Sequence, residues 1–178
     1  MKVSVIYRRR VARLAVAAAW VAVSSSGCSG SFPVLYGCTD RDEQYATTLA
    51  KLPIVAAHPD AAVLIDSSQG CDMDDGFAYA YREYRSDLAR EDIVSFYRTA
   101  VTADGWTFDR ENPSPVPTDG LVISAAVACF SKEIDGATAY LAVAFPSDLN
   151  VPGDPHQQAP DNTFVVDVTG SHDGAAWC

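Results

Sequence analysis

The chain has few basic residues outside its first segment, which argues against partners that bind through phosphate groups. Of its 13 Lys and Arg residues, five lie before Gly27, so the rest of the chain carries eight against 23 acidic residues. So acidic a body repels the phosphates of nucleic acids and the headgroups of anionic lipids. We therefore expect no nucleic-acid partner and no electrostatic attachment to a membrane.

Signatures of several enzyme classes and cofactor sites are also missing from the sequence. It contains no Gly-x-Ser-x-Gly, no Ser-x-x-Lys, no His-Glu-x-x-His and no phosphate-binding loop. It also has no Cys-x-x-Cys pair, which most cysteine zinc sites require. We expect no cofactor and no metal centre, and the sequence names no biochemical activity.

The chain lacks an apolar run long enough to span a bilayer. The longest run near its start, LAVAAAWVAV at residues 14–23, would form a helix of about 15 Å, against a hydrocarbon core of about 30 Å. It follows the basic segment MKVSVIYRRR and precedes the small residues SSSG. This order is typical of an export signal, which we predict at residues 1–27, with general and twin-arginine export both open.

Ser26-Gly27-Cys28 directly follows the apolar run and resembles the lipobox of bacterial prolipoproteins. The resemblance implies that Cys28 receives a diacylglyceryl group and that residues 28–37 form a short tether outside the membrane. The domain would then be attached to the extracytoplasmic face of the cell membrane. Ser25 stands where that family prefers Leu, so secretion after ordinary signal cleavage is the alternative.

Five cysteines become an even set once Cys28 is taken by lipid. Four cysteines in an oxidising compartment are expected to form two disulfides. We predict that Cys71 pairs with Cys129, because both flank strands expected to be neighbours, and that Cys38 pairs with Cys178, tying the two ends of the domain.

The remaining sequence predicts a single α+β domain over residues 38–178. An apolar stripe from Tyr45 to Leu52 predicts a helix that ends at Pro53, and helical spacing from Ile93 to Val101 predicts a second helix that ends before Gly105. Residues 61–65 form an apolar run that is either a strand or an irregular segment, and strand-like runs occupy residues 77–84, 106–110, 121–131, 137–145 and 163–169. Because the helices precede most of the strands, we expect two layers, with both helices on one face of a mainly antiparallel sheet.

Three short motifs resemble small exported lipoproteins of actinobacteria, which as a class are uncharacterised. They are Phe96-Tyr97 within a helix, Gly105-Trp106 at its end, and Gly70-Cys71-Asp72 before a tyrosine-rich strand. The resemblance implies that the protein is exported and shares the fold of these lipoproteins. It identifies no active-site residue.

Tyrosines are concentrated on one expected strand. In FAYAYREY, Tyr79 and Tyr81 share one face by the period of two, and Tyr84 follows. Large aromatic side chains on a strand under a helix usually belong to the core, so we predict a core role, with a binding surface as the alternative.

Asp72, Asp74 and Asp75 form an acidic cluster in the run CDMDDGF. A calcium loop counted from Asp72 would need glycine where Phe77 stands, so we predict a solvated turn and no metal site.

Our leading hypothesis is a lipid-anchored envelope domain that binds an envelope protein, a small ligand or a wall component without covalent chemistry. The alternatives are a secreted hydrolase that uses Asp74 or Asp75, and a structural or inhibitory envelope protein.

Overall fold

The computed structural model describes residues 37–112, 126–150, 158–172, 176 and 178. The predicted signal peptide, the lipidation site Cys28 and the tether as far as residue 36 lie outside the described residues. So do residues 113–125 and 151–157, in the two proline-rich loops.

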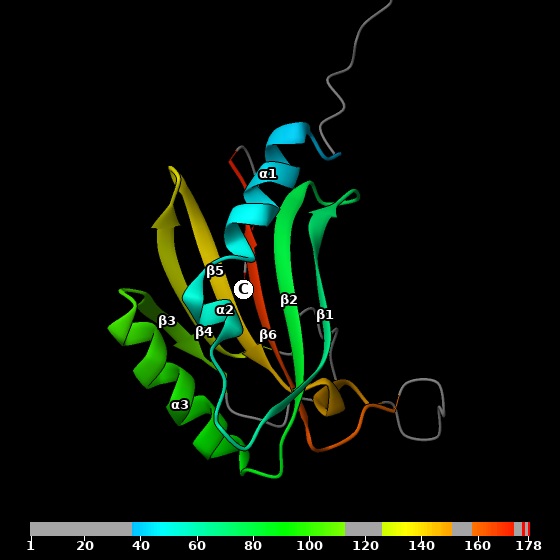
Figure 1. Ribbon diagram of the computed structural model, residues 1–178, viewed down its shortest axis with the longest axis vertical. Coiled ribbons are helices and arrows are strands. Elements are labelled where there is room, and N and C mark those ends of the chain that lie inside the picture. The colour runs from blue at the N-terminus through cyan, green and yellow to red at the C-terminus, as the bar shows by residue number, and fades with distance from the viewer. Residues whose placement is uncertain (1–36, 113–125, 151–157, 173–175, 177) are drawn as a thin grey trace, which may run out of the picture. The chain divides into compact units, whose positions relative to one another are not determined.

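A six-stranded antiparallel sheet forms one layer of the protein, with its helices on one face (Figure 1). The strands lie in the order β1-β2-β6-β5-β4-β3, and every neighbouring pair is antiparallel. They span Val63–Asp72 (β1), Phe77–Arg85 (β2), Thr107–Glu111 (β3), Ala126–Ile134 (β4), Ala137–Ala144 (β5) and Thr163–Gly170 (β6). The predicted α+β class and mainly antiparallel sheet are confirmed.

The helices are α1 (Asp40–Leu49), α2 (Pro53–Ala56) and α3 (Arg90–Ala103), and a 3-10 turn, η1, spans Pro146–Leu149. Thr39 caps α1: its hydroxyl accepts the backbone N–H of Asp42, whose carboxylate accepts the backbone N–H of Thr39 at 2.8 Å. Both predicted helices are confirmed. Pro53, predicted only as a stop, also begins α2, since proline at the first position of a helix loses no hydrogen bond.

Strand β1 is longer than the apolar run at residues 61–65 predicts. It extends to Asp72 through polar residues because each of them pairs with β2 along an antiparallel hairpin. As the first strand in the sheet order it has one partner only, and most of its residues are exposed.

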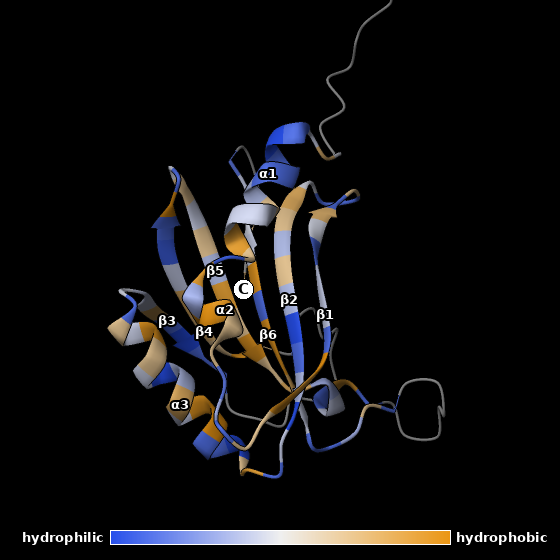
Figure 2. Cartoon of the chain, in the orientation of Figure 1, coloured by the Kyte–Doolittle hydropathy of each residue, from blue (hydrophilic) through white to orange (hydrophobic). Residues whose placement is uncertain are grey.

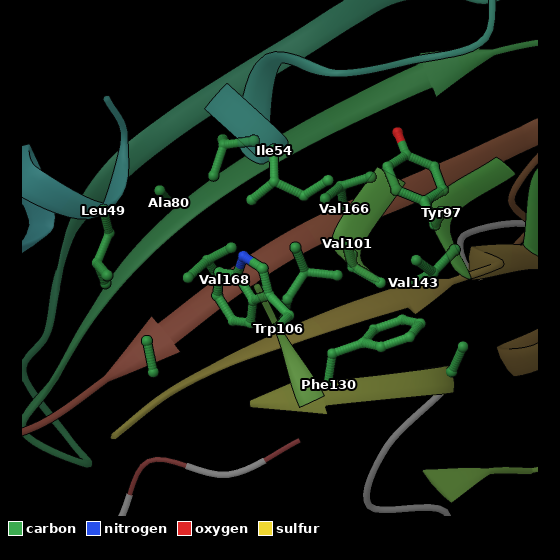
Figure 3. Close-up of a cluster of buried hydrophobic side chains, with 14 of the residues drawn as sticks. Leu49, Ile54, Ala80, Tyr97, Val101, Trp106, Phe130, Val143, Val166 and Val168 are labelled. Atoms are coloured by element: carbon green, nitrogen blue, oxygen red, sulfur yellow. The ribbon is translucent and has the colours of Figure 1, made fainter. Parts of the chain in front are cut away.

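Small residues on the sheet face below the helices allow the two layers to approach closely. Ala78, Ala80 and Ala139 are fully buried there, beside the larger core side chains drawn in Figure 3. Gly170 shows how tight the contact is, because a Cβ atom added to it would lie 2.7 Å from the ring of Tyr45 in α1. The hydropathy colouring shows β5 and β6, which cross this core, as mostly hydrophobic (Figure 2).

Buried tyrosines tie the helical layer to the sheet by hydrogen bonds. Tyr45 of α1 donates its hydroxyl to the carbonyl of Ile134 in β4 at 3.2 Å, and Tyr84 of β2 donates to the carbonyl of Val55 in α2 at 3.3 Å. Burial raises the pKa of Tyr45 to about 12, so its hydroxyl stays protonated and remains a donor at neutral pH.

Two disulfides are present, but the predicted pairing is wrong. Cys38 pairs with Cys71, with 5.8 Å between their Cα atoms, and Cys129 pairs with Cys178 at 5.9 Å. Strands β2, β6 and β5 lie between β1, which carries Cys71, and β4, which carries Cys129. Four strand spacings of about 4.8 Å separate the two by roughly 19 Å, beyond the reach of a disulfide.

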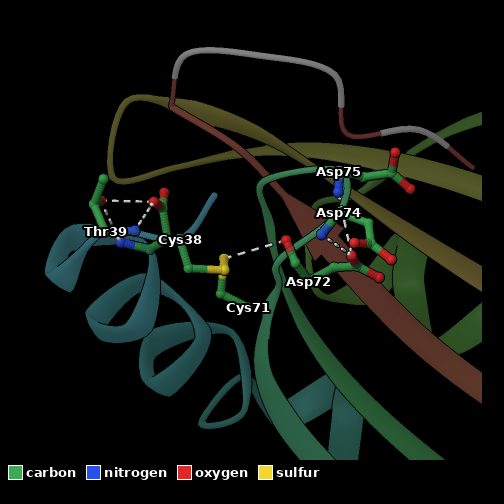
Figure 4. The surroundings of a disulfide bond; sticks show 7 residues. Cys38, Thr39, Cys71, Asp72, Asp74 and Asp75 are labelled. Atoms are coloured by element: carbon green, nitrogen blue, oxygen red, sulfur yellow. Dashed lines mark hydrogen bonds between the residues drawn. A yellow bond between two sulfur atoms is a disulfide. The ribbon is translucent and has the colours of Figure 1, made fainter. Parts of the chain in front are cut away.

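The first disulfide holds the start of α1 to the edge strand β1 (Figure 4).

No helix among the described residues is long and apolar enough to cross a membrane.

Candidate functional site

The sheet face opposite the helices, here called the open face, carries the tyrosines that we predicted to be core. Along β2 the helix side holds Ala78, Ala80 and Tyr84, all buried, while Tyr79 and Tyr81 alternate with them and are half-buried on the open face. The core prediction is confirmed for Tyr84 and wrong for Tyr79 and Tyr81. The reason is steric, because the side of β2 beneath α1 admits only small residues at these positions.

One row of side chains crosses the open face at the level of Tyr81. The register pairs Ser68 with Tyr81, Tyr81 with Asp167, Asp167 with Ala142, and Ala142 with Cys129. Asp167 therefore occupies the middle of the sheet, between an aromatic neighbour and a methyl group. Because the side chains of Ser68 and Ala142 are short, the larger side chains of Tyr81 and Asp167 have small neighbours on either side of the pair.

A concave site, here called the β2 cavity, lies over β1, β2 and β6. Its volume is about 330 Å³. The described residues that line it are aromatic, acidic or hydroxyl-bearing: Asp66, Ser68, Asp72, Phe77, Tyr79, Tyr81 and Asp167. None of these described lining residues is Lys, Arg or His, so the cavity is acidic.

The two tyrosines of the β2 cavity occupy definite positions. The ring of Tyr79 lies over Gly70 of β1, where an added Cβ atom would be 3.4 Å from the tyrosine hydroxyl oxygen. Tyr81 donates its hydroxyl to the carboxylate of Glu83 at 3.0 Å. Burial and this hydrogen bond raise the pKa of Tyr81 far above its ordinary value, so its hydroxyl stays protonated at physiological pH.

Asp167 is the unusual group of the cavity. Burial raises the pKa of its carboxyl to about 6. This carboxyl makes no hydrogen bond or ion pair with the residues that the structure describes. An acid that titrates close to neutral pH in a concave site is a common mark of a functional site. The sequence signal for it was a single acid within the valine-rich run TFVVDVT.

The β4 side of the open face is occupied by the end of the chain. The disulfide between Cys129 and Cys178 fixes the C-terminal residue there, where Arg110 donates to the carbonyl oxygen of Cys178. The Sγ atom of Cys178 also lies 3.6 Å from the carbonyl oxygen of Leu141. The β2 cavity lies on the same open face but over β1, β2 and β6, away from this segment.

The acidic cluster forms the turn between β1 and β2 (Figure 4). One carboxylate oxygen of Asp72 accepts the backbone N–H groups of Asp74 and Asp75, at 2.9 and 3.2 Å. Asp74 and Asp75 are exposed on this turn, and Asp72 alone of the three lines the β2 cavity. Across the described ranges, no group of three or more His, Cys, Asp or Glu residues is placed to hold a metal ion.

Comparisons with known proteins give no match, whether with family models, with curated proteins or with solved structures.

We predict that Asp167→Asn stabilises the protein above pH 6. Because the folded-state pKa of about 6 lies above the unfolded value of about 3.9, the wild-type free energy of unfolding falls as pH rises from about 4 to 6 and is level above that. The fall amounts to about 2–3 kcal/mol, and Asn abolishes it. Urea unfolding from pH 4 to 8 measures both effects.

The matched control is Asp92→Asn, which removes an exposed carboxylate from α3 on the opposite face. This variant should keep the wild-type slope between pH 4 and 6. A wild-type slope in Asp167→Asn as well would contradict the prediction.

Proposed function

We propose that the chain is an exported, lipid-anchored domain of the cell envelope that binds a ligand on its open face without covalent chemistry. The predicted export signal and the lipobox-like Cys28 support the location, and two disulfides suit an oxidising compartment. The observation that carries the binding role is the β2 cavity, with Tyr79, Tyr81 and Asp167 in its lining.

Tyrosine is well suited to such a surface. Its ring contributes a large contact area for the loss of little side-chain entropy, and its hydroxyl bonds to polar groups of a ligand. In this protein the short residue Ser68 is paired with Tyr81, which leaves a hollow beside the ring of Tyr81, while the ring of Tyr79 covers Gly70. A hollow walled by rings around a polar group is the usual form of a small-ligand site.

The hydrolase alternative gains no support from the acidic turn. General acid and base catalysis needs carboxyl groups that converge on a substrate in a cleft. Asp74 and Asp75 are instead exposed at the end of a hairpin, and the carboxylate of Asp72 is engaged in closing the turn. A structural or inhibitory role stays an alternative, for which the exposed Val63, Leu64 and Ile65 on the edge strand β1 would supply the contact.

We predict that Cys28 carries a diacylglyceryl group at the mature amino terminus. Peptide mass spectrometry of the protein from the membrane fraction of an expressing bacterium should find this group on Cys28. Cys28→Ser should release the protein from the membrane fraction. An unmodified terminus at another residue, or membrane retention of the serine variant, would refute the anchor.

Fluorine NMR of the full chain labelled with 3-fluorotyrosine tests the binding face. The chain has eight tyrosines, and Tyr79→Phe and Tyr81→Phe assign the two signals that matter. We expect small molecules from a panel of cationic, neutral and anionic compounds to shift the signals of Tyr79 and Tyr81. The signal of Tyr97, fully buried in the core, should not move.

The proposal fails if no compound at millimolar concentration shifts the Tyr79 and Tyr81 signals. It also fails if the shifts are spread equally over the tyrosines of both faces.

A further inference from the structure

The charge of the β2 cavity indicates the sign of its ligand. Asp66, Asp72 and Asp167 are in its lining, and Glu83 lies beside it, bonded to Tyr81. The described lining residues supply no cationic side chain to neutralise them, and the whole chain has a formal net charge of -10. Such a field attracts cations and repels anions.

The aromatic lining indicates the chemical class of the cation. Phe77, Tyr79 and Tyr81 bring three rings to one hollow, and the faces of aromatic rings attract ammonium and guanidinium groups. Tyr81 is directly opposite Asp167 in the register of β2 and β6. A cation beside Asp167 therefore lies within reach of a carboxylate and a ring together.

The spacing of the carboxylates favours an organic cation over a metal ion. Asp66 is two residues along β1 from Ser68, the residue in line with Asp167, and β2 lies between β1 and β6. Strand geometry thus separates the backbones of Asp66 and Asp167 by roughly 12 Å. A divalent cation needs several carboxylate oxygens that converge on it, each at about 2.0–2.6 Å from the ion.

We propose that the β2 cavity binds a small organic cation, with its ammonium or guanidinium group placed between the carboxylate of Asp167 and the rings of Tyr79 and Tyr81. This inference rests on the proposed function and names its ligand class.

Asp167 also gives the site a pH dependence. Several groups surround it on the open face: Asp66 from β1, Tyr79, Tyr81 and Glu83 from β2, and Tyr140 from β5. None of them carries a positive charge. Because the pKa of Asp167 is about 6, the charged partner of a bound cation is present at pH 7.5 and largely lost at pH 5.

Calorimetric titration of the full chain in detergent with n-butylammonium and n-butylguanidinium tests the inference. The controls share the butyl chain but are neutral (n-butanol) or anionic (butyrate). We expect both cations to bind at pH 7.5, at least about tenfold more tightly than n-butanol, since a charge-assisted contact changes affinity by that order. At pH 5 the affinity for the cations should fall about tenfold.

Variants locate the cation. Asp167→Asn, which we expect to fold, should weaken binding of n-butylammonium about tenfold or more and remove its pH dependence. Asp92→Asn, with the same loss of charge on the helical layer, should bind like the wild type. Tyr79→Phe keeps the ring and should keep the affinity, whereas Tyr79→Leu should weaken it several-fold.

A capped lysine amide as a further probe identifies the source of the cation. Tighter binding of this compound than of n-butylammonium indicates a lysine side chain on a peptide, and weaker binding indicates a free amine. Either result is consistent with the inference.

Equal affinity for n-butanol and n-butylammonium would overturn the cation and leave the binding face intact. Wild-type affinity in Asp167→Asn, or binding of Ca²⁺ in place of the organic cations, would also overturn it. If no compound of any charge moves the fluorine signals of Tyr79 and Tyr81, the proposed function itself fails.

Discussion

The close approach of α1 to the sheet is the constraint on which the rest of the structure depends. Tyr45 packs against Gly170 so tightly that no side chain fits between them, and the neighbouring strands present Ala78, Ala80 and Ala139 to the helices. Because this face admits only small residues at these positions, the alternating aromatic residues of β2 lie on the other face. The same contact that closes the core therefore places Tyr79 and Tyr81 where a ligand can reach them.

The open face contributes to stability over β4 and, in the function that we propose, to binding over β1, β2 and β6. On β4, the disulfide between Cys129 and Cys178 anchors the C-terminal end and limits the freedom of the unfolded chain. On β1, β2 and β6, the cavity keeps a half-buried acid, Asp167, whose ionisation opposes folding near neutral pH. An unfavourable group in a concave site is expected where binding, and not stability, determines the residue.

The sequence predicts the elements well because their signals are local. The stripe from Ile93 to Val101 and the glycine at 105, which has a φ of 80°, define α3, and the alternation from Phe77 to Tyr84 defines β2. The alternation along β2 shows which residues share a face, but it does not show which face meets the helices. The size of the tyrosine side chains is therefore the only basis for predicting a core role, and this basis is misleading for Tyr79 and Tyr81. Disulfide pairing depends on the order of strands in the sheet, and this order separates Cys71 from Cys129. The cavity depends on the register between β2 and β6, which are distant in sequence. Neither property has a local sequence signal.

Hydroxyl-radical footprinting of the native protein, read residue by residue by mass spectrometry, tests most directly which face of β2 is open. Tyr81 and Tyr84 lie on the same strand three residues apart, so each serves as the reference for the other. The account predicts rapid oxidation of Tyr79 and Tyr81 and protection of Tyr84, which is 2% exposed. Oxidation of Tyr84 at the rate of Tyr79, or protection of all three, would contradict it.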